Sequence, residues 1–299
     1  HKITPYLSNA LIGKCIFIRY LIDRKVRIGF PDGNLRKWTK DEFCKLLENK
    51  NQTINFLKYL KGHFNEEAFL ADDSDLQKIP KDAFGVLNRL MRGTKITTGQ
   101  ESLFDIYDFS IIPVEFISNV YEHFIGSENQ AESGAYYTPL FLVEYILSET
   151  VEKFFDENPK EYNCKVLDPA CGSGIFLVEA LRRIIEQYNK INNITSANSK
   201  SFKKTLKEIA ENNIYGIDND KGGNAINVAI FSVYLALLDY LKDPKDIENF
   251  TFPSLKSRNF FDKDFFDLDA EFNKEFKGIK FDFIIGNPPW KRGSNEEAL

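Results

Sequence analysis

The chain has 299 residues, of which 43% are hydrophobic and 28% charged, and this composition excludes a disordered tail and a collagen-like repeat. It carries 39 Lys and Arg against 44 Asp and Glu. The net charge of −5 excludes a wholly basic nucleic-acid-binding protein but leaves room for a local basic face. No apolar run approaches the roughly 20 residues that cross a membrane. Because the chain starts at His1 with no signal peptide before the first helical pattern, we interpret it as a piece of a longer polypeptide.

Cysteine and histidine are few and widely spaced, which disfavours a zinc site and a disulfide framework. They stand at Cys15, Cys44, Cys164, Cys171, His1, His63 and His123. No two cysteines form a Cys-x-x-Cys pair. We therefore expect no bound metal, and free thiols in a reducing cytoplasm.

Apolar residues recur every three or four positions through much of the first 125 residues. The pattern is clearest in residues 7–22, 54–64 and 114–124, where it predicts amphipathic helices, and a turn is expected at Pro31–Asn34. Packing between helices explains these apolar stripes better than a ligand site does. We therefore predict that residues 1–125 form a helical N-terminal domain without catalytic groups of its own.

Short apolar runs alternate with helical patterns in residues 126–299, and this alternation predicts an α/β domain with a doubly wound, mostly parallel sheet. The expected strands are 165–168, 214–218 and 281–285, and the expected helices are 175–188 and 225–241. The polar residues 189–201 are interpreted as an exposed connection. Residues 262–275 alternate acidic residues with Phe, and we interpret them as a surface loop or edge whose rings face inward.

The strongest local signal is Asp168-Pro169-Ala170-Cys171-Gly172-Ser173-Gly174, between a predicted strand and a predicted helix. The two glycines let a ligand approach the backbone, and the start of the helix offers unpaired N–H groups. This favours a nucleotide-like cofactor over an ordinary strand-to-helix turn. The third glycine of the dinucleotide fingerprint is missing, because Val178 and Glu179 follow instead, and its absence argues against NAD.

The second signal is Tyr215-Gly216-Ile217-Asp218-Asn219-Asp220, at the end of the next predicted strand. A carboxylate in that place can accept hydrogen bonds from two ribose hydroxyls. Its distance from Gly174 exceeds the about 20 residues usual in Rossmann proteins, and the polar connection accounts for the excess. We favour Asp218 for the ribose, whereas Asp220 competes as a cap of the following helix.

The third signal is Asn287-Pro288-Pro289-Trp290, directly after the last predicted strand. The two prolines stiffen the loop and remove two backbone donors, which leaves the Asn287 amide oxygen and the Pro288 carbonyl as acceptors. Trp290 adds a flat face for stacking. Such a loop could hold an exocyclic amino group, whereas a Pro-Pro turn alone would be structural.

The fourth signal, Gly134-Ala135-Tyr136-Tyr137-Thr138-Pro139, is weak by itself, and Thr138 could simply cap a helix that Pro139 opens. Together and in this order, the four motifs resemble the N6-adenine DNA methyltransferases of bacterial restriction-modification systems. The likeness is to type I modification subunits or to the methylase region of type IIG enzymes. It covers about residues 114–290, and the helical N-terminal part is similar to the helical domain that precedes the catalytic domain there.

The resemblance implies that the sheet is of the S-adenosylmethionine-dependent methyltransferase type and that residues 126–299 are a catalytic domain cut after the Asn-Pro-Pro-Trp loop. S-adenosylmethionine is then the methyl donor, and double-stranded DNA with a flipped-out adenine is the substrate. By the same resemblance, the cofactor pocket includes Tyr136, Tyr137, Thr138, Asp168, Gly172, Ser173, Gly174, Asp218, Asn219 and, loosely, Asn259 or Phe260. The target adenine lies against Asn287, Pro288, Pro289 and Trp290. No metal is implied.

The resemblance also implies partners: specificity and restriction subunits, or a fused recognition or nuclease region. The later strands of the sheet, the aromatic segment that completes the base pocket and a target-recognition domain are not found in the sequence, so we expect the isolated chain to be inactive on DNA. Two alternatives stay open. One is protein glutamine methylation, which also uses an Asn-Pro-Pro-aromatic loop, and the other is a non-catalytic cofactor-binding or assembly module. N4-cytosine methylation is chemically near but has Ser-Pro-Pro as its commoner loop.

Overall fold

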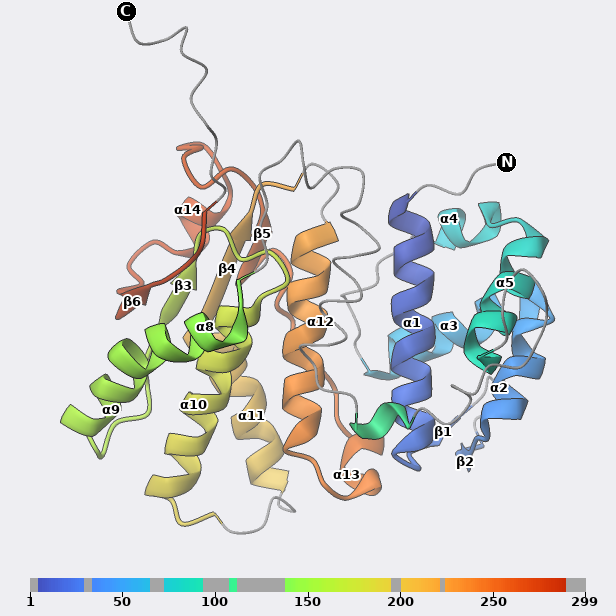
Figure 1. The fold of residues 1–299 in the computed structure, drawn as a ribbon, viewed down its shortest axis with the longest axis horizontal. Helices are drawn as coiled ribbons and strands as arrows, with labels where there is room; N and C mark the ends of the chain where they lie inside the picture. Colours follow the sequence, from blue (N-terminus) through green and yellow to red (C-terminus); the bar gives the residue numbers. More distant parts are fainter. Residues whose placement is uncertain are drawn as a thin grey trace, which may run out of the picture.

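The computed structural model describes residues 5–29, 34–64, 73–93, 108–111, 138–194, 200–220 and 224–288, and Figure 1 shows their arrangement. Helices dominate the N-terminal part. Its elements are α1 (Pro5–Asp23), β1 (Arg27–Ile28), β2 (Arg36–Lys37), α2 (Lys40–Leu47), α3 (Lys50–Phe64), α4 (Asp73–Lys78), α5 (Lys81–Arg92) and η2 (Phe109–Ile111). The helices predicted at 7–22 and 54–64 are confirmed, whereas the one at 114–124 lies outside the described residues.

Local signals explain where several of these elements begin and end. Thr39 begins α2 with a capping box, in which its side chain accepts from the Glu42 N–H and the Glu42 carboxylate accepts from the Thr39 N–H. Gly93 ends α5 with a left-handed φ of 75°. Strands β1 and β2 pair antiparallel on either side of the predicted turn.

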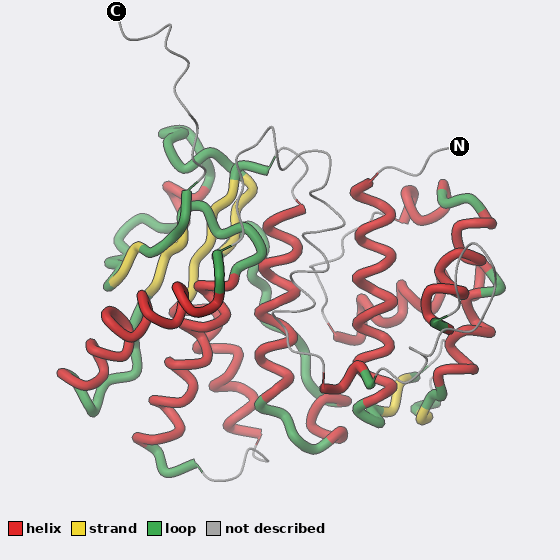
Figure 2. The backbone as a smooth tube through the Cα atoms, viewed as in Figure 1, coloured by secondary structure: helices red, strands yellow, loops and turns green. Residues whose placement is uncertain are grey.

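The second part is an α/β unit with four parallel strands in the order β5-β4-β3-β6 (Figure 2). Its elements are α8 (Leu140–Leu147), the π-helical turn η3 (Ser148–Glu152), α9 (Lys153–Glu157), β3 (Val166–Asp168), α10 (Ile175–Ile191), α11 (Lys200–Asn213), β4 (Ile214–Asp218), α12 (Asn224–Asp239), α13 (Pro244–Glu248), β5 (Phe260–Asp262), α14 (Phe272–Glu275) and β6 (Phe283–Ile284). A parallel α/β sheet is therefore confirmed.

Successive residues of β3, β4 and β5 enter different hydrophobic cores, as the alternation of side chains along a strand requires. Val166 and Phe260 join the large core that includes the buried faces of α10 and α12. Leu167, Ile217 and Phe261 join a smaller core on the other face, formed with residues 265–281 and α14. Both faces of the sheet are therefore covered, as is usual for parallel sheets.

The N-terminal helices share the large core with the α/β unit. The ring of Phe17 in α1 lies 5.8 Å from that of Phe64, 6.1 Å from that of Phe231 and 5.9 Å from that of Phe252. Figure 1 accordingly shows α1 and α12 side by side. The predicted boundary between residues 125 and 126 lies outside the described residues.

Several elements differ from the sequence prediction, among them β1, β2 and α14, which it does not contain. The structure forms β5 and α11, where the pattern predicts neither a strand nor a helix, and β6 is shorter than the predicted strand 281–285. The rings of residues 262–275 face inward in part: Phe265 and Phe272 pack on the sheet, whereas Phe266 is exposed.

All four cysteines are buried and carry free thiols. No described helix combines the length and apolar character that crossing a membrane requires. Over the same described ranges, no three His, Cys, Asp or Glu side chains gather as metal ligands would.

Candidate active site

Three of the four sequence motifs meet at one edge of the sheet, together with the Thr138 end of the fourth. Because the strands are parallel, their carboxyl ends lie at the same edge. Asp168 ends β3, Asp218 ends β4, and Gly286 and Asn287 follow β6 across the ladder from Asp168. The order of strands therefore places the glycine motif between the other two strand-end motifs.

The glycine loop between β3 and α10 is held by backbone hydrogen bonds. The Cys171 N–H donates to the Ile217 carbonyl at 2.9 Å, and the Gly174 N–H donates to the Cys171 carbonyl at 2.7 Å. Gly172 and Gly174 have φ of 51° and 83°, in the left-handed region that favours glycine. Gly174 then begins α10, so the free N–H groups of that helix face the carboxyl edge of the sheet.

Asp218 is bound to the glycine loop. Its Oδ2 accepts from the Gly172 N–H at 2.8 Å, which joins two motifs that stand 46 residues apart. Burial raises the pKa of Asp218 to about 6, against the hydrogen bond from Gly172, while the charges of Asp220 and Asp262 add to the rise. At pH 7 this carboxyl is mostly ionised and can still accept further hydrogen bonds.

Asp168 lies deeper, beneath the loop that follows β6. Its Oδ1 accepts from the Ala170 N–H at 3.0 Å. Burial raises its pKa to about 8; the Ala170 N–H opposes the rise and the charge of Asp218 adds to it. A Cβ at Gly286 would clash with Asp168 Oδ1, so glycine at this position lets the third motif approach the first.

Asn287 and Thr138 meet from opposite ends of the described α/β unit. The Asn287 Nδ2 donates to the Thr138 Oγ1 at 3.1 Å, and Thr138 is buried. Pro139, with φ −58° and ψ 137°, is the residue that caps α8, without a side-chain bond. The suggestion that Thr138 caps this helix is therefore wrong, because its hydroxyl accepts from Asn287 and the Pro139 carbonyl accepts from the Leu142 N–H at 2.9 Å.

The other predicted residues are placed differently. Ser173 is buried in the glycine loop, and the Asn219 Nδ2 donates to Asp264 Oδ2 at 3.3 Å near the end of β4. Asp220 accepts from the Ala225 N–H at 3.2 Å, as the competing helix-cap interpretation predicts. Pro288 is exposed beside Asn287. Tyr136, Tyr137, Pro289 and Trp290 lie outside the described residues.

Asn259 is not brought to this edge. Its fully buried side chain donates to the carbonyls of Glu211 and Ile214, both at 2.9 Å, at the opposite end of β4. Asn259 precedes β5, whereas a side chain at the carboxyl edge must end or follow its strand. Phe260, the loose alternative, points into the large core. Asp262 ends β5 and pairs in register with Asp218, so it is the acidic side chain at this edge that sequence reasoning missed.

The glycine loop is open at Gly172 within the part of the chain that the structure describes. A Cβ built on Gly172 would meet none of the described atoms within 4 Å, although the backbone around it is held by hydrogen bonds. A rigid loop with positive φ, an open side and a helix start is suited to a ligand that carries both anionic and hydroxyl groups. The carboxylate of Asp218 can accept from hydroxyls, and that of Asp168 can pair with a cation.

Comparisons with known proteins show the family of this chain. Residues 114–298, more than half of the chain, match the sequence model of the family described as N-6 DNA Methylase. The chain belongs to this family. No solved structure matches the chain significantly.

Several curated proteins are similar to this family member over part of their length. The type II restriction enzyme and methyltransferase RM.Eco57I of Escherichia coli is 27% identical over 62% of this chain and 22% of its own length. The type I restriction enzyme HindI methylase subunit of Haemophilus influenzae is 36% identical over 36% of this chain and 23% of its own. The type II methyltransferase M.VspI of a Vibrio species is 31% identical over 38% of this chain and 28% of its own. The aligned parts thus cover about a quarter of each of these relatives.

Proposed function

We propose that this chain supplies the cofactor-binding and base-binding parts of a DNA methyltransferase that transfers a methyl group from S-adenosylmethionine to N6 of adenine, within a restriction-modification system. The observation that carries the proposal is the hydrogen bond between Thr138 and Asn287, at the sheet edge where Gly172 also binds Asp218. The bond between Thr138 and Asn287 joins the base-binding motif to the motif that ends in Thr138 and Pro139. Membership of the N-6 DNA Methylase family and the names of the relatives support the same reaction.

The residues at the edge fit the cofactor chemically. The open side of Gly172 could admit the methionine part, whose ammonium would pair with Asp168 and whose carboxylate would accept from the free N–H groups of α10. Asp218, at the end of β4, would accept from the ribose hydroxyls, and Asn219 and Asp262, at the same edge, would lie near the adenine ring. When bound, the sulfonium supplies an activated methyl group.

Asn287 acts on the nucleophile. The amino group of adenine is a weak nucleophile because its lone pair is delocalised into the ring. Thr138 holds the Asn287 Nδ2, and this fixes which way the amide oxygen points. That oxygen and the Pro288 carbonyl could then accept from the amino group, which would favour a pyramidal and more nucleophilic nitrogen. Catalysis comes mainly from positioning.

The names of the relatives also suggest partners. They include type I methylase subunits and single proteins that are both restriction enzyme and methyltransferase. We propose duplex DNA as the substrate. Specificity and restriction subunits, or a fused recognition or nuclease region, would supply functions for which the described residues show no site.

Two measurements test the proposal. Calorimetry with S-adenosylhomocysteine tests the cofactor site in the 299-residue chain. Transfer of tritium from labelled S-adenosylmethionine to an adenine-containing duplex tests catalysis, by this chain and by a longer polypeptide that carries it. We expect Asn287→Ala to lower turnover by at least about 100-fold with cofactor affinity nearly unchanged, because the lost acceptor acts on the reacting geometry.

A glutamine-bearing peptide serves as the competing substrate in the same assay. Methylation of the peptide and not of the duplex would replace DNA by protein as the substrate class. Full adenine methylation by the Asn287→Ala variant would contradict the role of Asn287. Failure of the wild-type chain to bind S-adenosylhomocysteine would contradict the cofactor assignment.

A further inference from the structure

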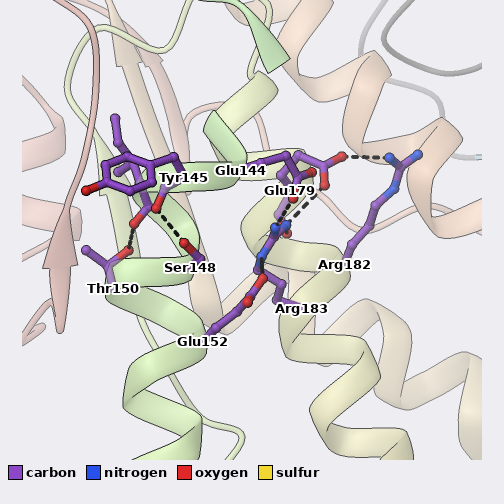
Figure 3. Close-up of polar contacts among 9 residues, drawn as sticks. Glu144, Tyr145, Ser148, Thr150, Glu152, Glu179, Arg182 and Arg183 are labelled. Atoms are coloured by element: carbon purple, nitrogen blue, oxygen red, sulfur yellow. Dashed lines mark hydrogen bonds and ion pairs between the residues drawn. The ribbon is translucent and has the colours of Figure 1, made fainter. Parts of the chain in front are cut away.

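Arg183, in the middle of α10, lies among three carboxylates that come from two helical segments (Figure 3). Its Nε donates to Glu152 Oε1 at 2.6 Å, its Nη1 donates to Glu179 Oε2 at 3.1 Å, and its Nη2 pairs with Glu144. The Arg183 side chain is only 10% exposed. A planar guanidinium with five N–H groups holds three such partners in one plane, whereas the three donors of an ammonium group rotate about its flexible stem.

The two helical segments that Arg183 joins both begin at the candidate active site. α10 begins directly after the glycine loop, at Gly174, and α8 begins directly after Thr138 and Pro139. The fixed φ of Pro139 and the bonds from the Leu142 and Val143 N–H groups to its carbonyl make this connection short and stiff. Thr138 must therefore follow any displacement of α8.

We propose that Arg183 is a positioning residue for the base-binding loop. It fixes α8 against α10, and thereby fixes Thr138, and with it Asn287, relative to the glycine loop. Arg183 itself is bonded to helix side chains and one helix carbonyl, far along α10 from the site. Its role in methyl transfer rests on the function proposed above, whereas its mechanical link to Asn287 does not.

The π-helical turn η3 explains how two glutamates of one segment reach the same arginine. Residues eight apart in a regular α-helix, such as Glu144 and Glu152, differ in direction by about 80°. The wider turn at Ser148–Glu152 reduces this difference, and both carboxylates contact Arg183. The hydroxyls of Ser148 and Thr150 donate to carbonyls of the preceding turn at 2.7 Å, which supports this irregular stretch.

Arg182, which precedes Arg183 on α10, reaches a different helix. Arg182 shares Glu179 with Arg183, through a bond of 2.6 Å, but its other arm reaches Asp239 of α12 at 3.2 Å. These ion pairs of Arg182 lead from α10 to α12, whereas those of Arg183 lead from α10 to α8 and η3.

The side-chain amide of Asn287 reports on this link directly. The 299-residue chain is labelled with ¹⁵N at asparagine, and its amide signals are followed by NMR, with Asn287 assigned by the loss of its signal in Asn287→Asp. Glu144→Gln removes the charge on the α8 side of the link at a position that is 47% exposed, so the variant is expected to fold. Glu149→Gln, an exposed glutamate in the same helical segment, is the matched control.

We expect Glu144→Gln and Arg183→Gln to shift or broaden the Asn287 signal beyond the scatter of the other asparagines, and Glu149→Gln to leave it unchanged. A merely stabilising ion pair would lower the melting temperature without moving this signal. An unchanged Asn287 signal in folded Glu144→Gln overturns the proposal, even if Arg183→Gln does not fold. Binding of S-adenosylhomocysteine by the same samples tests the proposed function separately, because its failure would leave the Asn287 result standing.

Discussion

Asp168 and Asp218 end neighbouring strands, yet burial raises their pKa values to different extents. Burial raises the pKa of Asp168 to about 8, so its carboxyl is mostly protonated, whereas the pKa of Asp218 is about 6 and its carboxyl is mostly charged. The hydrogen bond from the Gly172 N–H favours the charged form of Asp218. The two side chains should therefore respond differently to a bound cofactor.

Cofactor binding should release protons from Asp168. An ammonium group next to this carboxyl favours its ionised form, so its pKa falls on binding and up to one proton per ligand is released at pH 7. Calorimetry with S-adenosylhomocysteine in buffers of different ionisation enthalpy measures this number. Asp168→Asn should abolish the release, and an unchanged proton count in this variant would exclude Asp168 as the partner of the ammonium.

Asp218→Asn should instead weaken binding without abolishing the release. Hydrogen bonds to a charged group contribute about 1.5–3 kcal/mol each, so the loss of charge predicts at least a 10-fold weaker affinity for S-adenosylhomocysteine. In the wild-type chain, affinity should fall as the pH drops through about 6, because the protonated carboxyl accepts ribose hydroxyls less well. Unchanged affinity and an unchanged pH profile in a folded variant would refute the ribose assignment.

Some residues of the candidate site could be predicted from the sequence because they stand at the end of a strand. Asp218 and Asn287 both follow apolar runs, and the structure places both at the carboxyl edge. The sequence does not place Asn259 correctly, because Asn259 comes before its strand, after a turn in which Ser257 has a φ of 57°. No apolar run in the sequence marks where that strand begins. The contact between Thr138 and Asn287 joins residues 149 apart, and only the folded chain shows it.

Whole elements could also be predicted where an apolar run marks a strand. β3 and β4 are apolar runs bounded by polar residues, and their pattern predicts them. β5 has three residues, Phe260–Asp262, within a stretch of alternating aromatic and acidic residues, so its sequence does not separate a buried strand from a surface loop. α11 begins in the polar stretch after residue 199, where composition favours a connection, and its apolar face packs only in the tertiary structure.

Gly172 and Gly174 of the glycine loop are required for different reasons. Substituting each of them by Ala distinguishes the two reasons. A Cβ at Gly174 would lie 2.9 Å from the Ala229 Cβ of α12, whereas a Cβ at Gly172 would meet nothing within 4 Å. Both positions have positive φ, so each Ala substitution costs about 1–2 kcal/mol of stability from the backbone alone. Gly174→Ala should cost a further 1–3 kcal/mol, roughly, from overpacking.

Urea denaturation of both glycine variants measures the difference. Gly174→Ala should have the clearly lower midpoint, and Gly172→Ala should keep most of its stability while weakening S-adenosylhomocysteine binding, because its new methyl group points into the open side of the loop. Equal loss of stability in the two variants would show that α12 moves away easily. In that case, the close packing of Gly174 would not fix the start of α10.

Across the whole molecule, the N-terminal helices are tied to the α/β unit by polar bonds as well as by rings. Arg24 donates to the Leu238 and Leu241 carbonyls at 3.1 and 2.8 Å. Arg27 forms an ion pair at 2.7 Å with Glu248, whose side chain is buried. The ion pairs of Arg182 and Arg24 meet at Asp239, so the polar network of α10 extends through α12 to α1.

This continuity predicts that the helical part and the sheet unfold together. Phe17 contacts rings from α3, α12 and the segment before β5, so Phe17→Ala removes contacts on both sides and should cost about 3–5 kcal/mol. Amide hydrogen exchange should then show the same loss of protection in α3 and in β4, whereas the half-exposed Val86→Ala should change neither. If β4 amides kept their wild-type protection while α3 amides lost theirs, the two parts would unfold independently, and the shared aromatic core would be an interface between separate folding units.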